Sequence, residues 1–264
     1  MSQPWEIYDA LLDGLPGDVV VRASGQGPRW TRVLNSAGGV GTAWTMDVRS
    51  RPALTEGSLD GRPLRDVGAL VKSWNLAEAS IGQAAINSWY SREETAAANG
   101  FEPTGEGLTW RQVFDPYQER IAGKKVAVIG HFPFAEAALA DAGEYICLER
   151  NLQPGDWPDS ACEYVLPECD VVFISSSSFV NKTAPRLIEL SRDAHTVLVG
   201  PSTPISPVLL DYSVDTVTGF VAARSLSDPT ALAEMVPAGD IGPGFRIHQL
   251  QRSEERRVGK ECRS

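Results

Sequence analysis

The clearest pattern in the chain is a short, continuous apolar run in its second half. Residues 126–129 are all apolar, follow a charged turn and stop at Gly130. A helix-compatible run over 135–142 comes next. A buried parallel strand has this pattern, because helices cover both of its faces. We therefore predict a strand, a tight turn and a helix at this place.

The same alternation continues toward the C-terminus. Further strands are predicted at 145–148, 171–174, 197–199 and 216–221. Further helices are predicted at 182–192, 207–212 and 229–235. This alternation is typical of a parallel sheet with helices on both faces. We expect an α/β, Rossmann-like domain over residues 110–251, which begins with a short helix at 110–121.

The first 98 residues have a different pattern. A helix at 5–12 is followed by strand-like runs at 18–23, 30–34 and 40–46, and then by helices at 64–72 and 76–90. Asn75 or Ser73 would be a suitable N-cap for the last helix. A meander followed by helices indicates a smaller α+β domain over 1–98. Residues 99–109, rich in Gly, Pro and Glu, are predicted to be a linker.

The last residues, 252–264, need separate treatment because they have no hydrophobic period. They match the conceptual translation of a common sequencing adapter. We interpret them as an artefact and leave them out of the fold prediction.

Charge and composition exclude several classes of partner. The chain carries a formal net charge of −10, so it offers no basic surface for nucleic acid or an anionic membrane. It has no apolar run of about 18 residues, which argues against a transmembrane helix. The N-terminal helix contains acids and no basic region, so we expect no signal peptide and a cytoplasmic location.

The cysteines indicate neither a disulfide framework nor a structural zinc site. Without Cys262, three remain, Cys147, Cys162 and Cys169, with no CxxC pair and no histidine at ligand spacing. Cys147 lies in an apolar strand pattern and is predicted to be a buried thiol.

Polar residues follow the predicted strands of the second domain. The carboxyl ends of parallel strands meet at one edge of the sheet, so these residues should converge on one crevice. Helix capping is the competing explanation for individual Ser and Thr residues, but it explains the cluster as a whole less well. The residues concerned are His131, Phe132, Glu149, Ser176, Asn181, Thr183, Ser202 and Thr203.

Three kinds of chemistry are possible at this edge of the sheet. Glu149 follows Gly130 by 19 residues, as a ribose-binding acid would, but His131 and Phe132 stand where a dinucleotide turn needs glycine. The turn therefore disfavours NAD. Nucleophilic catalysis lacks a G-x-S-x-G elbow around the serines at 175–178. For a metal, the candidate ligands are His131, Glu149, Cys147 and acids of the first domain, although no pair has a recognisable spacing.

In the first domain, the predicted helix 76–90 is rich in small residues. Gly82 lies in its middle, where glycine costs roughly 1 kcal/mol relative to alanine, so close approach of another backbone or a ligand is expected. Glu78 and Asn87 are polar positions on this helix. The competing interpretation makes Asn75 the cap and Glu78 the acid of a capping box.

Several motifs together resemble a known family. They are Gly130-His131-Phe132-Pro133-Phe134, Glu149-Arg150, the stretch 166–172, Asn181-Lys182-Thr183 and Gly200-Pro201-Ser202-Thr203-Pro204. In this order they resemble the heavy-metal chelation family, which has a Rossmann-like domain. The segment 75–87, after Val40-Gly41-Thr42-Ala43, resembles its companion domain, which is similar to the N-terminal domain of enolase.

The resemblance implies a heavy or transition metal ion, or a small metal-bearing ligand, in an inter-domain cleft. His131 and Glu149 would contact the metal directly. Hydrogen bonds would come from Asn181, Thr183, Ser202 and Thr203, with Phe132 and Ser176 beside them, while Glu78 and Asn87 would close the site from the first domain.

Two other functions stay open. One is an enzyme acting on a small anionic or nucleotide-like substrate in the same cleft, with His131 as acid–base. The other is a non-catalytic interaction module, and a homo-oligomer is compatible with each function.

Overall fold

A three-stranded antiparallel sheet forms the first structural unit in the computed structural model, which describes residues 3–103, 110–244 and 246–251. Its order is β1 (Val21–Gln26), β2 (Trp30–Asn35), β3 (Val40–Trp44). Helix α3 (Leu76–Tyr90) packs on β3 so closely that a Cβ at Gly41 would lie 1.9 Å from the Ala84 carbonyl oxygen. The other helices of this unit are α1 (Glu6–Asp13), α2 (Leu64–Gly68) with a 3₁₀ turn (Ala69–Lys72), and α4 (Glu93–Ala98).

The second unit is built on an eight-stranded sheet in the order β4-β11-β10-β9-β8-β5-β6-β7. The strands from β10 to β7 are parallel to one another, and β11 and β4 are antiparallel additions. This confirms the Rossmann-like parallel sheet. The bounds are β4 (Glu102–Pro103), β5 (Lys125–Ile129), β6 (Glu144–Glu149), β7 (Trp157–Pro158), β8 (Val171–Ser175), β9 (His195–Val199), β10 (Thr216–Val221) and β11 (Arg246–Gln251).

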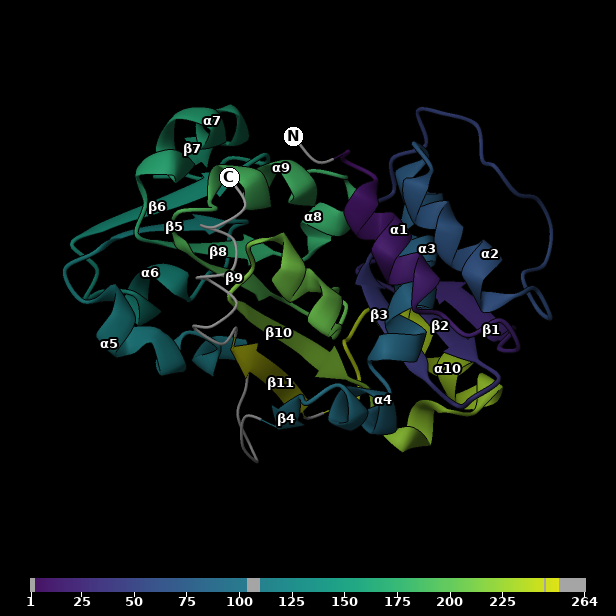
Figure 1. Cartoon of the computed structure of the whole chain (residues 1–264). Helices are drawn as coiled ribbons and strands as arrows, with labels where there is room; N and C mark the ends of the chain where they lie inside the picture. The colour runs from purple at the N-terminus through teal and green to yellow at the C-terminus, as the bar shows by residue number, and fades with distance from the viewer. Residues whose placement is uncertain (1–2, 104–109, 245, 252–264) are drawn as a thin grey trace.

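Alternate residues of the central strands enter two different cores. On β5, Val126 and Val128 face a cluster that contains Phe114 and Phe173. Ala127 faces the opposite side of the sheet and belongs to the large core, which also contains apolar side chains from the helices of the first unit. Burial on both faces explains why these strands are continuous apolar runs. In Figure 1 the antiparallel sheet with α1 to α3 lies beside the carboxyl ends of the parallel strands.

The helices differ from the predictions in length and type. The helix predicted at 110–121 is instead two 3₁₀ turns (Trp110–Gln112 and Asp115–Tyr117) followed by α5 (Gln118–Ile121), because Pro116 has no N–H for a continuous helix. The segment Pro207–Tyr212 is also a 3₁₀ helix. The other α-helices of this unit are α6 (Ala135–Ala138), α7 (Cys162–Val165), α8 (Ser177–Val180), α9 (Ala184–Leu190) and α10 (Pro229–Met235). Short 3₁₀ turns also occur at Asp159–Ala161, Leu166–Glu168, Arg224–Leu226 and Val236–Ala238.

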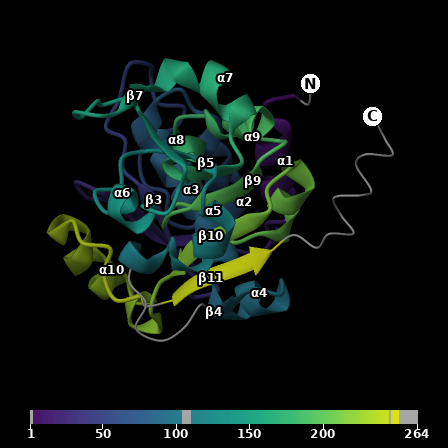
Figure 2. The ribbon, with the colours of Figure 1, turned by 90° about the vertical axis from the view of Figure 1, so that its left-hand side faces the viewer.

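The two units are interleaved in the chain. Helix α10 belongs to the predicted second domain but packs on β1 and β2, where Leu34, Val40, Leu226 and Leu232 form a small core. Figure 2 shows β10, β11 and β4 side by side, so part of the predicted linker pairs with the sheet. Residues 104–109 of this linker and the predicted artefact, 252–264, lie outside the described residues.

β1 begins at Val21 and ends at Gln26, so it is shifted toward the C-terminus from its prediction of 18–23. It continues through Gly25, where a Cβ would lie 2.7 Å from Cγ2 of Val236, so glycine is needed for this close approach. In the described part of the chain, every helix is too short or too polar to cross a bilayer.

Candidate metal centre

The site begins at the end of β5, where Gly130 turns the chain. Gly130 has φ +99°, and a Cβ there would lie 2.9 Å from Cβ of Ser175 at the end of β8. Glycine therefore lets the ends of β5 and β8 approach each other, and its positive φ turns the chain into His131.

Three potential ligands converge beside this turn. His131 Nδ1 lies 3.1 Å from both carboxylate oxygens of Asp156 and 3.9 Å from Cys147 Sγ. One ligand atom from each residue lies within 4.8 Å of the other two. His131 follows β5, Cys147 lies on β6 and Asp156 comes from the loop before β7. An imidazole, a thiol and a carboxylate are therefore brought together within one unit.

The environment keeps the Asp156 carboxylate charged. Its side chain is only 3% exposed, and burial raises its pKa. Hydrogen bonds from the Gln153 N–H, at 2.9 Å, and from Cys147 and His131 outweigh burial, so the pKa ends below its usual range. The His131 side chain is 26% exposed, so solvent reaches the imidazole.

Cys147 is a protonated thiol in this environment. Burial, followed by the hydrogen bond to Asp156 and the charge of that carboxylate, raises the pKa of the thiol to about 12. A metal that binds the sulfur must therefore displace its proton, because the thiolate is the ligand form.

Glu149 lies beside the three potential ligands but engages the backbone. Its Oε2 accepts the His131 N–H at 2.9 Å, and its Oε1 accepts those of Arg150 and Asn151 at 2.8 and 2.9 Å. The carboxylate thus holds the end of β6 against the turn that carries His131. Direct metal contact by Glu149 stays a prediction.

Comparison with known proteins gives the family. Two family models, both described as "Putative heavy-metal chelation", match residues 112–248 and residues 8–90. The chain belongs to this family. A family member from Desulfitobacterium hafniense, of unknown function, has a similar crystal structure: identity is 35%, coverage is 94% of this chain and 98% of that one, and the TM-score is 0.82.

A second member of the heavy-metal chelation family, from Pyrococcus horikoshii, supports the fold alone. Its structure, also of a protein with unknown function, is 20% identical, covers 94% of this chain and 99% of that one, and has a TM-score of 0.75. No curated protein matches significantly.

In the present protein, most of the residues predicted to hydrogen-bond a ligand bond to nearby protein groups instead. Asn181 Oδ1 accepts both the N–H and the hydroxyl of Thr183, at 3.1 and 2.6 Å. The Thr203 hydroxyl donates to the Gly200 carbonyl at 2.8 Å, and Ser176 is buried. Phe132 packs edge-on against Phe114 in the core. Their roles in ligand binding stay predictions.

Asn87 and Ser202 join the two units. The Asn87 amide donates to the carbonyls of Thr42 and Ser202 at 2.8 and 2.9 Å, and Gln83 donates to the Ser202 carbonyl at 3.1 Å. The Ser202 hydroxyl accepts the Trp44 N–H at 2.7 Å. These bonds fix the antiparallel sheet and α3 to the loop after β9.

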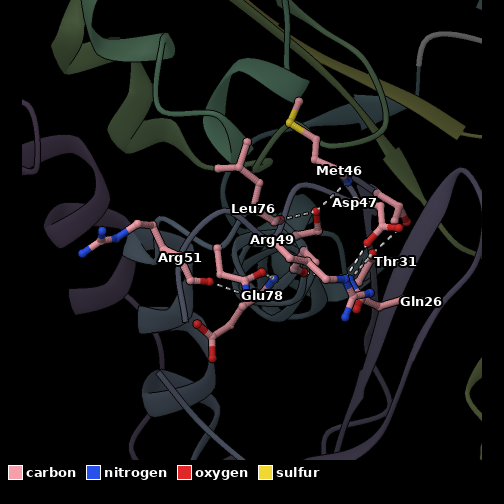
Figure 3. A network of polar contacts seen from close by, with 12 residues as sticks. Gln26, Thr31, Met46, Asp47, Arg49, Arg51, Leu76 and Glu78 are labelled. Carbon is pink, nitrogen blue, oxygen red and sulfur yellow. Dashed lines mark hydrogen bonds and ion pairs between the residues drawn. The ribbon is translucent and has the colours of Figure 1, made fainter. Parts of the chain in front are cut away.

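Glu78 holds a loop of its own unit. Its carboxylate accepts the N–H groups of Leu54 and Thr55 at 2.9 Å. Figure 3 shows Glu78, Leu76 and Arg51 in the network of polar contacts around the start of α3. The Asn75 side chain accepts the Glu78 N–H, which confirms the predicted N-cap. The capping box is not completed, because the Asn75 N–H donates to Ser73 instead. Closure of a cleft by Glu78 stays a prediction.

The sequence did not indicate Asp156 as a ligand, and it indicated Cys147 mainly as a buried thiol. Asp156 follows Gly155 in a polar loop, 25 residues after His131, and no spacing signal links the two. Two surface cavities, of about 260 Å³ beside Glu6 and about 400 Å³ beside Arg22, contain none of the predicted site residues. Binding in an inter-domain cleft therefore stays a prediction.

Proposed function

We propose that the protein binds a thiophilic divalent metal ion, of the zinc and cadmium class, through His131, Cys147 and Asp156. The observation that carries the proposal is the convergence of the three ligand atoms within 4.8 Å. The family description, heavy-metal chelation, supports the same class of ligand.

The distances suit a tetrahedral ion. Bonds of about 2.0–2.3 Å to nitrogen, oxygen and sulfur place neighbouring ligand atoms roughly 3.3–3.8 Å apart. The distances from His131 Nδ1 to Asp156 and to Cys147, 3.1 and 3.9 Å, need only small side-chain adjustments to meet this range. A thiolate with an imidazole favours soft and borderline metals over Mg²⁺ and Ca²⁺, which prefer oxygen.

Our proposal places the ion within the second unit. All three ligands come from residues 131–156, whereas Glu78 and Asn87 of the first unit engage backbone groups. With three protein ligands, a fourth position remains for water or for a small molecule that carries the metal.

Calorimetric titration with Zn²⁺, Cd²⁺ and Mg²⁺ tests the proposal, with thermal melting as a second readout. A metal at 100 times its dissociation constant should stabilise the fold by about 2.7 kcal/mol. We expect Cd²⁺ and Zn²⁺ to bind one ion per chain and Mg²⁺ to have no effect. His131→Ala, Cys147→Ser and Asp156→Asn should each weaken binding by more than about 100-fold.

Asp159→Asn is the matched control, because Asp159 is a nearby carboxylate that pairs with Arg150 instead. It should bind metal as the wild type does. Undiminished binding by the Cys147 and Asp156 variants would overturn the proposal. Loss of binding in His131→Ala and Glu149→Ala, with binding kept by the Cys147 and Asp156 variants, would move the metal to the ligand set predicted from sequence.

A further inference from the structure

The cavity beside Arg22 lies between the turn that joins β2 to β3 and the start of α10. Its volume is about 400 Å³, within the roughly 300–1,000 Å³ of small-molecule sites in proteins. Residues 34–36 and Gly38 form one wall, and Ser227 and Pro229 form the other. The Ser227 hydroxyl donates to the Gly38 carbonyl at 2.6 Å and joins the two walls. A ligand held here would therefore contact segments that lie 189 positions apart in the chain.

A β-bulge brings Arg22 to this cavity. Val21 pairs with Asn35 and Ala23 pairs with Leu34, so Arg22 is an extra residue between two consecutive pairs. Such a bulge bends its strand and re-aims the side chain of the extra residue. Leu34 and Asn35, which face the bulge from β2, line the cavity together with Arg22. The irregularity of β1 thus has a place in the construction of the cavity.

The lining carries a cation and no acid. Arg22 is exposed, and no carboxylate among the described residues forms a salt bridge with it. Asp228 follows Ser227 in the chain, but its Oδ1 accepts two N–H groups at the start of α10, at 2.9 and 3.1 Å. In a chain with a formal net charge of −10, the cavity is therefore a local region that favours an anion.

Ser36 adds a hydroxyl to the same cavity. Its oxygen accepts the Val20 N–H at 3.1 Å, so its own proton stays available to donate. The guanidinium of Arg22 presents its N–H donors in a flat fork that matches pairs of phosphate oxygens. A fork and a separate hydroxyl offer donors from more than one direction, which suits a tetrahedral oxyanion better than a planar carboxylate.

We propose that this cavity binds the phosphate group of a small phosphate monoester, with the Arg22 guanidinium and the Ser36 hydroxyl as donors. A monoester is favoured over inorganic phosphate because the cavity has room for more than the anion, and Leu34 and Pro229 add apolar lining for carbon atoms. The site contains none of the three proposed metal ligands and does not depend on metal binding.

Calorimetric titration of the full chain tests this inference, with glycerol 3-phosphate, inorganic phosphate and acetate as probes. A chelating resin removes metal ions beforehand, so that no bound metal carries the anion. We expect glycerol 3-phosphate to bind one molecule per chain and more tightly than inorganic phosphate, and acetate to bind more weakly than both. Tighter binding of inorganic phosphate would refute the monoester. Dissociation constants above about 10 mM for both phosphates, or tighter binding of acetate, would overturn the site.

Four variants separate this cavity from a general effect of charge. Arg22→Gln removes the cation at an exposed position, so it should melt as the wild type does and bind glycerol 3-phosphate at least about tenfold more weakly. Arg22→Lys keeps the charge without the fork and should lose part of the affinity. Ser36→Ala should weaken binding about three- to tenfold. Arg29→Gln is the matched control, because Arg29 is exposed in the turn between β1 and β2 and does not line the cavity.

Arg29→Gln should bind glycerol 3-phosphate as the wild type does. Equal losses in Arg22→Gln and Arg29→Gln, or unchanged binding in Arg22→Gln, would overturn the inference. Unchanged binding in Ser36→Ala would overturn the role of the hydroxyl.

Discussion

Metal binding through Cys147 should become tighter as pH rises. Burial raises the thiol pKa from 9.0 to about 12, so the thiol is protonated at neutral pH and must release one proton to a bound metal. Below the pKa, each pH unit should increase the apparent affinity about tenfold, or about 1.4 kcal/mol. Asp156, whose pKa is lowered, is already ionised and adds nothing to this slope. A thiol with an ordinary pKa is ionised above about pH 9, so metal affinity through it would stop rising there. Metal affinity through Cys147 should keep rising above pH 9.

Competition with a chelating dye for Cd²⁺, from about pH 7.5 to 9.5, measures this slope. Cys162→Ser is the control, because burial also raises the pKa of the Cys162 thiol to about 12, yet Cys162 lies outside the candidate ligand group. It should match the wild type. Cys147→Ser should lose the slope and weaken binding by more than the 10–100-fold typical of outer partners. A wild-type affinity independent of pH, or an unchanged slope in Cys147→Ser, would refute the reasoning.

Three further perturbations test the scaffold. Asn87→Ala removes two hydrogen bonds to buried carbonyls and should lower the unfolding free energy by about 2–4 kcal/mol; an unchanged urea midpoint would contradict this. Gly41→Ala places a Cβ 1.9 Å from the Ala84 carbonyl oxygen, so this variant should not fold and should show no cooperative thermal unfolding transition. Gly17→Ala, whose Cβ would have no atom within 4 Å, should unfold at the wild-type temperature. Burial lowers the pKa of folded Lys182 from 10.5 to about 8, so the unfolded state binds more protons between these values. Wild-type stability should thus rise with pH there, by less than the roughly 3 kcal/mol of the full shift because solvent screens the partly exposed amine. Stability curves of the wild type and Lys182→Met that run parallel would refute this.

Much of the fold could be predicted because its causes are local. The strand at 126–129 appears as β5, since four apolar residues that stop at a glycine can be buried only between two helical layers. The Asn75 cap is also local, because a side-chain oxygen there reaches the N–H three residues later. Chain breaks were harder to predict: Pro116 divides an expected helix, and Lys182 adopts a left-handed backbone where a helix was expected to begin.

The amino-acid sequence by itself determined the parallel sheet, the small antiparallel companion and the position of His131 at a strand end. Only the tertiary structure decided which groups meet His131. Glu149 had the better spacing, but its oxygens accept three backbone N–H groups, and Asp156 reaches the imidazole from a loop that no periodic pattern marks. The physical reason is one of range. Strands and caps follow from neighbours along the chain, whereas the partners of a buried polar group depend on how distant loops fold back to satisfy it.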